Sequence, residues 1–293
     1  MNKKIFIFCF ILSVFSSICF SQEQTDHAKY ILYLPKGMET SKAYPLVMAL
    51  SPSADAQSMI NVWKPIADKY KWIIMASKES KNGMDMHQGL KDLARSLEGV
   101  CRQFSVDQSK IIITGFSGGA MCSHAFSYTY PEMFSAIILN TGMMHEYYFD
   151  KRSSYPRHKV AVFLASPTDF RYNEMKRDKT FLDSLGWVTK WIEFQGGHAL
   201  APQAAYLEAA NWVNEEWQAA EKIKNAPVVS RSKNNGRFKV DGIIFNPQGK
   251  SSAIVNGEIL QEGDRFKGVL IARIRKNSVD VIIDGEVMTL RLE

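Results

Sequence analysis

The sequence predicts a three-layer α/β sandwich built on a mostly parallel sheet, followed by a small all-β module. Short apolar runs alternate with helical patterns from Lys29 to about residue 220. Most of these runs are rich in Val, Ile and Phe on both faces, which is typical of parallel strands covered by helices on each side. After residue 225 the pattern changes to short strand-like runs separated by turn residues, which predicts a separate β module.

The predicted sheet consists of seven runs, and helical patterns lie between several of them. The helices are expected where apolar residues recur every three or four positions. The expected strands are Tyr30–Leu34, Pro45–Ser51, Trp72–Ala76, Lys110–Thr114, Ala136–Asn140, Val160–Ala165 and Trp191–Phe194. The expected helices are Ile60–Tyr70, Gly89–Phe104, Ala120–Tyr128 and Gln203–Trp217, the last running on to about Lys224.

The carboxyl-terminal third is expected to be a linker followed by the β module. Residues 22–224 form the predicted α/β domain, residues 225–237 are polar and predict a linker, and residues 238–293 form the module. Turn signals such as Asn256-Gly257 and Asp284-Gly285 separate its expected strands. These strands are Val240–Phe245, Ser252–Val255, Val269–Ile274, Val279–Ile283 and Val287–Leu292.

The first 21 residues have the pattern of a secretory signal peptide. A basic start is followed by an apolar run that ends at Phe20, and small and polar residues follow from Ser21. The run is shorter than the ~20 residues that a spanning helix needs, so an uncleaved anchor is the less favoured alternative. We therefore expect cleavage after Ser21, a secreted or periplasmic protein, and no membrane span after cleavage.

Charge and cysteine content exclude several classes of protein. The formal net charge is +6 over 293 residues; residues 22–220 are neutral, and residues 221–293 carry 13 basic and 9 acidic residues. This excess is too dilute to predict nucleic-acid binding. Cys101 and Cys122 are expected to be buried free thiols, with a disulfide as the alternative. The pattern contains no metal-ligand constellation, and no cofactor is expected.

A nucleophile motif stands between an expected strand and an expected helix. Gly115-Phe116-Ser117-Gly118-Gly119 matches G-x-S-x-G directly after Lys110–Thr114. That context is the one in which a sharp turn presents a reactive serine at the start of a helix. Side chains at the two outer glycines would meet neighbouring backbone in such a turn. The motif therefore predicts Ser117 as a nucleophile.

A reactive serine needs a base, and the base needs an orienting acid. In folds with such a turn the chain order is Ser, then Asp or Glu, then His. Among the later histidines, only His198 directly follows the last expected strand, in a Gly-Gly-His loop, so we expect it to be the base. The acid should follow Val160–Ala165, which selects Asp169. The alternatives are His124, His145 and His158 for the base, and Glu174 and Asp178 for the acid.

Stabilisation of the developing oxyanion requires two backbone donors. The first expected donor is the N–H of Gly118, the residue after the nucleophile. The second should come from the loop after Pro45–Ser51, where the N–H of Ser53 is the best candidate.

These residues resemble the α/β-hydrolase superfamily, in particular exported esterases related to feruloyl esterases and polyhydroxybutyrate depolymerases. The likeness covers about two thirds of the chain. It rests on Tyr30–Pro35, Tyr44–Leu50, the approach to Ser117 from Val106-Asp107, and Gly196-Gly197-His198. It implies an α/β-hydrolase sandwich in which Ser117, Asp169 and His198 hydrolyse carboxylic esters. One segment differs from the pattern of this family. This chain has Ser51-Pro52-Ser53 at the position where those esterases have His-Gly followed by a small residue.

The module resembles the small periplasmic β domain of type II secretion and pilus-assembly proteins. The likeness rests on Asp241–Phe245, Ser251–Gly257 and Glu262-Gly263-Asp264. It implies protein contacts in an envelope complex and contributes no catalytic residue.

The sequence as a whole predicts an exported serine hydrolase that acts on a small or polymer-linked ester. Two alternatives remain open at this point. One is a noncatalytic envelope protein that uses the hydrolase scaffold for binding, and the other is a serine peptidase, since the same residues cleave amides.

Overall fold

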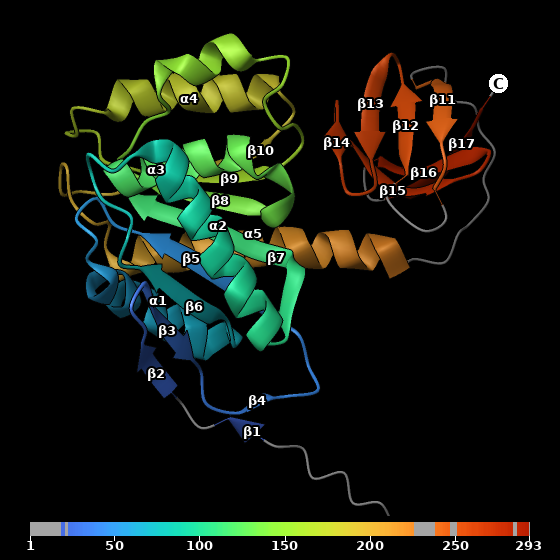
Figure 1. Ribbon diagram of the computed structural model, residues 1–293. Coiled ribbons are helices and arrows are strands. Elements are labelled where there is room, and N and C mark those ends of the chain that lie inside the picture. The colour runs from blue at the N-terminus through green and yellow to red at the C-terminus, as the bar shows by residue number, and fades with distance from the viewer. Residues whose placement is uncertain (1–18, 21–22, 226–237, 247–250, 284–285, 293) are drawn as a thin grey trace, which may run out of the picture.

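The computed structural model describes residues 19–20, 23–225, 238–246, 251–283 and 286–292. Within them an α/β domain and a carboxyl-terminal β module lie side by side (Figure 1). The predicted signal peptide, apart from Cys19 and Phe20, and nearly all of the predicted linker lie outside the described residues. Cys19–Phe20 form a two-residue strand, β1, beside β4 (Met38–Glu39).

The α/β domain is built on an eight-stranded sheet with the order β10-β9-β8-β7-β5-β6-β3-β2. The six strands from β10 to β6 are parallel; at one edge β3 pairs antiparallel with β6, and β2 pairs antiparallel with β3. The strands are β2 (Glu23–Asp26), β3 (Tyr30–Leu34), β5 (Tyr44–Leu50), β6 (Ile73–Ser77), β7 (Val106–Phe116), β8 (Ala136–Asn140), β9 (Val160–Ala165) and β10 (Val188–Glu193). The mostly parallel sheet predicted from the sequence is therefore confirmed.

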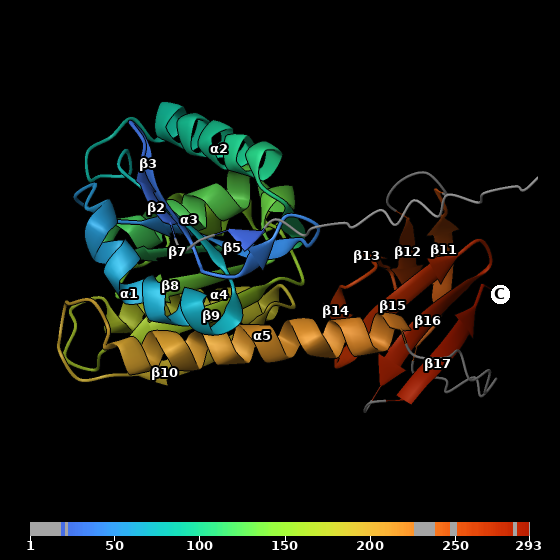
Figure 2. The ribbon, with the colours of Figure 1, turned by 90° about the horizontal axis from the view of Figure 1, so that it is seen from below.

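Helices cover both faces of this sheet, which makes three layers (Figure 2). Alternate residues of β5 show why. Leu46 and Met48 belong to the apolar core that includes residues of α2, α3 and α4, while Val47 and Ala49 belong to the core that includes residues of α1 and α5. Such strands are apolar on both faces because both faces are buried. The helices are α1 (Ala56–Tyr70), α2 (Met86–Gln103), α3 (Gly118–Thr129), α4 (Tyr172–Ser184) and α5 (Gln203–Asn225), and two short 3₁₀ segments span Pro131–Met133 and Glu146–Lys151.

The ends of several elements differ from the sequence prediction for physical reasons. β7 begins at Val106, four residues early, and β10 begins at Val188, three residues early. Both early segments contain polar or half-buried residues, so apolar periodicity gave no signal there. α1 and α2 begin earlier than predicted because Asp55 and Asp85 cap them, accepting hydrogen bonds from the backbone N–H groups of Ser58 and Gln88.

The β module consists of two antiparallel sheets around a common apolar core. One sheet contains β11 (Val240–Ile244), β12 (Ser252–Val255) and β13 (Glu258–Gln261); the other contains β14 (Arg265–Phe266), β15 (Val269–Arg275), β16 (Ser278–Ile283) and β17 (Glu286–Arg291). Asn256 and Gly257 have φ of 49° and 79° and form the two-residue turn between β12 and β13. This is the hairpin geometry that an Asn-Gly pair favours. The sequence analysis did not anticipate β13 and β14.

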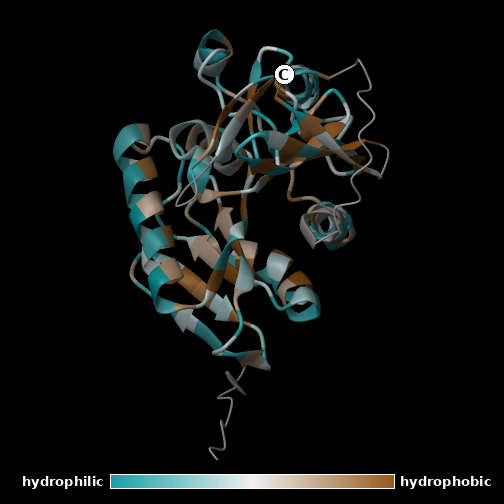
Figure 3. Ribbon diagram, turned by 90° about the vertical axis from the view of Figure 1, so that its right-hand side faces the viewer, coloured by the Kyte–Doolittle hydropathy of each residue, from teal (hydrophilic) through white to brown (hydrophobic). Residues whose placement is uncertain are grey.

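Charged side chains join the two parts. The guanidinium of Arg265 lies 3.0 Å from the carboxylate of Glu216 on α5, and that of Arg157 lies 4.0 Å from the carboxylate of Glu258. Hydrophobic residues instead gather inside each part, along the strands (Figure 3). Each part therefore has its own apolar core.

Cys101 and Cys122 are both free, as the sequence analysis expected. Cys122 is buried on α3, whereas Cys101, near the end of α2, is only half-buried. Among the described residues, no helix has the length and apolar character needed to cross a membrane.

Candidate active site

The G-x-S-x-G motif forms a tight turn between β7 and α3. Ser117 has φ 53° and ψ −117°, a conformation that residues with a Cβ rarely adopt. A Cβ on Gly115 would lie 2.2 Å from the backbone of Gly119, and one on Gly119 would lie 2.2 Å from the carbonyl oxygen of Leu50. Glycine is therefore required at positions 115 and 119. The strained backbone conformation of the turn is that of Ser117.

The loop after β10 brings His198 to this turn. The imidazole Nε2 lies 2.8 Å from the hydroxyl oxygen of Ser117, although 81 residues separate the two in the chain. Gly196 and Gly197 have φ of 150° and 66°, and these conformations, which favour glycine, turn the chain back over the sheet. The backbone N–H of Gly197 donates to the hydroxyl of Ser166, 3.0 Å away, which ties the loop to the end of β9.

A buried amide that the sequence analysis missed also holds this loop. The side chain of Asn140, the last residue of β8, donates to the carbonyl of Ala199 and accepts from the backbone N–H of Ala201 and the hydroxyl of Tyr206. These three distances lie between 2.8 and 3.2 Å. The sequence contains one indication of this role, because Asn140 is a polar residue at the end of an otherwise apolar strand. Asn140 is a positioning residue for the histidine loop.

Asp169 completes the chain of hydrogen bonds. One carboxylate oxygen lies 2.6 Å from Nδ1 of His198, and the other accepts a hydrogen bond from the backbone N–H of Arg171 at 2.6 Å. The Asp169 side chain is fully buried, whereas 28% of the His198 side chain is exposed. A buried carboxylate held by two partners keeps a fixed direction, which suits a group that orients an imidazole.

The alternative acids and bases lie elsewhere. Glu174 pairs with the guanidinium of Arg171 at 3.2 Å. Asp178 lies inside the protein, where one carboxylate oxygen is 4.0 Å from Nε2 of His124 and accepts from the backbone N–H of Met144 at 2.5 Å. The structure gives neither carboxyl group a contact with His198.

Burial changes the ionisation of both members of that internal pair. Desolvation raises the pKa of Asp178 to about 7, although the N–H of Met144 and the charge of Arg177 oppose the rise. Desolvation also lowers the pKa of His124 to about 3. The remaining alternative bases, His145 and His158, flank β8 and β9 and have no contact with Ser117. His145 caps a 3₁₀ segment, accepting from the N–H of Tyr147.

The segment expected to complete the oxyanion site lies against the turn. Leu50 and Ser51 contact Gly119, and Pro52 lies beside Gly118. The N–H of Ser53 points toward the Ser51 hydroxyl at a distance of 3.3 Å. Gly118 opens α3, so its N–H is one of the helix donors with no partner within the helix.

Two aromatic rings flank His198. The Phe170 ring centroid is 4.5 Å from that of the imidazole, and the Phe116 centroid is 5.5 Å away. Phe170 is 65% exposed although it is a large apolar residue. The two rings therefore lie against the imidazole, and Ser117 is partly exposed.

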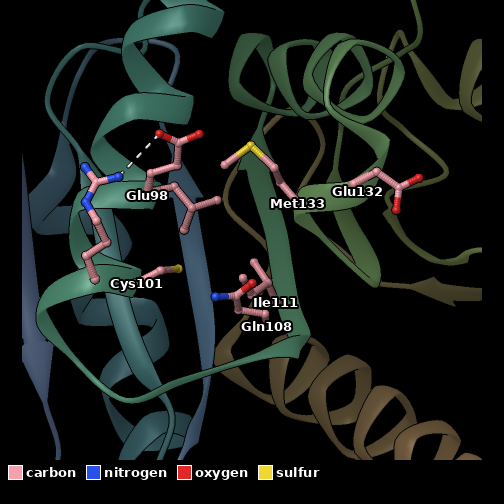
Figure 4. Close-up of a pocket in the computed structure, with 8 residues that line it drawn as sticks. Glu98, Cys101, Gln108, Ile111, Glu132 and Met133 are labelled. Carbon is pink, nitrogen blue, oxygen red and sulfur yellow. Dashed lines mark ion pairs between the residues drawn. The ribbon is translucent and has the colours of Figure 1, made fainter. Parts of the chain in front are cut away.

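A separate pocket lies toward the other end of β7 (Figure 4). It has a volume of about 310 Å³, and its lining comes from α2, β7 and the first 3₁₀ segment, with Cys101, Ile111 and Met133 among the lining residues. Ile111 is six residues before Ser117 in an extended strand, which corresponds to about 20 Å. The pocket contains none of the predicted site residues. Across the described part of the chain, no group of three or more His, Cys, Asp or Glu side chains is arranged to hold a metal ion.

Comparisons with known proteins agree with this architecture. No protein-family profile matches the chain. A probable acetylxylan esterase A of Neosartorya fischeri is 27% identical over 127 residues, which cover 38% of this chain and 34% of the relative. Acetylxylan esterase A of Talaromyces purpureogenus is 25% identical over 127 residues, covering 38% and 33%. The chain thus matches only about a third of the length of these relatives.

Solved structures define the fold. S-formylglutathione hydrolase FrmB of Staphylococcus aureus superposes with a TM-score of 0.53 at 13% identity, over 67% of this chain and 95% of that one. Esterase PE8 superposes with a TM-score of 0.52 at 16% identity, over 67% and 98%. The amino-terminal two thirds of the chain therefore has the α/β-hydrolase fold, as the sequence predicted.

Proposed function

We propose that this chain is an exported serine hydrolase that cleaves carboxylic esters, with Ser117 as nucleophile, His198 as base and Asp169 as the orienting acid. The observation that carries the proposal is the continuous hydrogen-bond chain from Ser117 through both ring nitrogens of His198 to buried Asp169. It lies on a strained strand–helix turn of the kind that exposes a nucleophile. The partial likeness to acetylxylan esterases favours esters as the substrate class.

In the proposed reaction, Ser117 attacks the ester carbonyl carbon while His198 Nε2 takes the hydroxyl proton. Asp169 holds Nδ1 and stabilises the imidazolium. The negative charge develops on the former carbonyl oxygen, beside the N–H of Gly118 and the expected second donor, Ser53. The C–O bond then breaks, and the imidazolium passes its proton to the departing alcohol. Water, activated by the same imidazole, hydrolyses the acyl-enzyme and restores Ser117.

Labelling with a fluorophosphonate probe tests this proposal. The parent protein should be labelled and should hydrolyse p-nitrophenyl acetate, because the probe reacts with activated serines. Ser117→Ala and His198→Ala should each lose labelling and several orders of magnitude in turnover. Ser109→Ala is the matched control, since Ser109 lies near the other end of the same strand. Absence of labelling in the folded parent would instead support a noncatalytic scaffold.

Export and envelope contact are further parts of the proposal. Residues 1–21 have the pattern of a signal peptide, so the exported protein should begin at Gln22 when its amino terminus is sequenced. The β module is the proposed protein-contact part. The side chains of Ile244 and Ile259 on the β11–β13 sheet are 63% and 64% exposed, which leaves them available for contact with another protein.

A further inference from the structure

We infer that the side-chain carboxamide of Asn82 is a donor of the oxyanion site and supplies the interaction for which the Ser51–Ser53 loop is poorly suited. This inference rests on the proposed ester hydrolysis at Ser117. It assigns a catalytic contact to a residue for which the sequence motifs give no signal.

The first observation is the contact between Asn82 and the nucleophile turn. A Cβ placed on Gly118 would lie 1.9 Å from the amide oxygen of Asn82 and 3.4 Å from Pro52. The carboxamide therefore occupies the space that any side chain at position 118 would take. Gly118 is the residue whose backbone N–H should bind the oxyanion, so the carboxamide lies beside that donor.

The second observation is how firmly the Asn82 segment is attached to the loop after β5. Ser53 and Lys81 face each other in an antiparallel bridge. The N–H of Asn82 donates to the carbonyl of Pro52 at 2.8 Å, and the N–H of Ala54 donates to the carbonyl of Ser80 at 2.9 Å. The Ser80 hydroxyl also donates to the carbonyl of Ser51 at 3.2 Å. The backbone that carries Asn82 is thus held in place before any substrate binds.

The third observation concerns the competing donor. The N–H of Ser53 already has an internal acceptor, the Ser51 hydroxyl at 3.3 Å, and the two serine hydroxyls lie 3.2 Å apart. Reorienting Ser53 toward an oxyanion would break these contacts. Asn82 is an exposed residue, and its carboxamide can present its NH₂ group in place of its oxygen by rotation about its terminal bond. Side-chain amides serve as oxyanion donors in other hydrolases.

Removal of Asn82 should therefore affect the chemical step. For Asn82→Ala and Asn82→Leu we expect kcat for p-nitrophenyl acetate to fall about 10²–10³-fold, the loss typical of one oxyanion donor, with KM changed less than about threefold. Lys81→Leu is the matched control from the same segment and should retain parental kcat. Complete but slower fluorophosphonate labelling of the Asn82 variants would show that Ser117 and His198 remain competent, which separates this test from that of the proposed function.

Gly118→Ala provides an independent test, because its methyl group would displace the carboxamide. If both substitutions remove the same interaction, their effects on kcat should not add. The kcat of the double variant Asn82→Ala/Gly118→Ala should then be close to that of the more affected single variant. Three results would overturn the inference. They are a kcat within threefold of the parent for both Asn82 variants, an equal loss in Lys81→Leu, and fully additive losses with Gly118→Ala.

Discussion

Replacing Ser117 by glycine should make the protein more stable than replacing it by alanine. Ser117 has φ 53° and ψ −117°, and such a conformation costs about 1–3 kcal/mol in a residue with a Cβ. Glycine adopts it freely, but its greater entropy in the unfolded chain offsets about 0.5–1 kcal/mol. Both variants lose the hydrogen bond to His198, so that loss cancels. The middles of these two ranges differ by roughly 1 kcal/mol, and we expect the glycine variant to be more stable by about that amount.

Thermal and urea unfolding of the two variants measure this difference. In a chain of this size 1 kcal/mol corresponds to about 2–4 °C in Tm. Ala220→Gly is the control, because there glycine should lower the stability instead of raising it. Ala220 is an exposed residue inside α5, where glycine should cost about 0.5–1 kcal/mol. Equal stability of the glycine and alanine variants at position 117 would refute the reasoning, because the turn would then store no strain at the proposed nucleophile.

Three further predictions concern the proposed acid, the buried carboxyl group of Asp178 and the module. Asp169→Asn should lower kcat about 10³–10⁴-fold, because an amide favours the wrong imidazole tautomer, whereas Glu174→Gln should remain close to the parent; the reverse order would assign the acid to Glu174. The raised pKa of Asp178, about 7 against an ordinary 3.8, means that the folded state retains a proton that the unfolded state has lost. Asp178 by itself should therefore lower stability by up to about 4 kcal/mol as pH rises from about 4 to 7. The lowered pKa of His124, about 3, should raise stability over much of the same range, so the Asp178 part is isolated by comparing a variant with the parent. Asp178→Asn should then gain stability over the parent in urea unfolding at pH 8 and be nearly equal at pH 4; an advantage that shrinks as pH rises would contradict this. Removal of residues 226–293 should leave fluorophosphonate labelling of residues 1–225 intact, and an insoluble product would show that the module is structural.

The elements that were predicted best from the sequence are those whose pattern depends only on neighbouring residues in the chain. Ala136–Asn140 and Val160–Ala165 are continuous apolar runs bounded by polar residues, and the structure has both strands with these limits. The G-x-S-x-G turn was equally visible, because steric exclusion by the backbone requires glycine at both ends. In contrast, β2 is a polar edge strand with mostly exposed residues, so it has no periodic apolar pattern to detect.

Contacts between distant segments could not be predicted in this way. Asn140 was visible only as the end of a strand, and its three hydrogen bonds to the histidine loop depend on how that loop folds back. The internal approach of His124 to Asp178 joins two helices 54 positions apart, and polar residues in a helix are usually exposed. Asn82 lies in a polar loop, where nothing in the sequence distinguishes it from an ordinary surface residue.

The register of the sheet explains why three loops so far apart in sequence meet. Phe116 at the end of β7 pairs with Asn140 of β8, Asn140 pairs with Leu164 of β9, and the next residue of β9, Ala165, pairs with Glu193 of β10. The last residues of four parallel strands therefore form one row across the sheet. Ser117, Asp169 and His198 follow their own strand ends by one, four and five residues. A shift of one residue in any pairing would move a loop by about 3.3 Å, more than the 2.6–2.8 Å contacts tolerate. The apolar faces that fix this register, buried against helices on both sides, therefore also align the proposed catalytic residues.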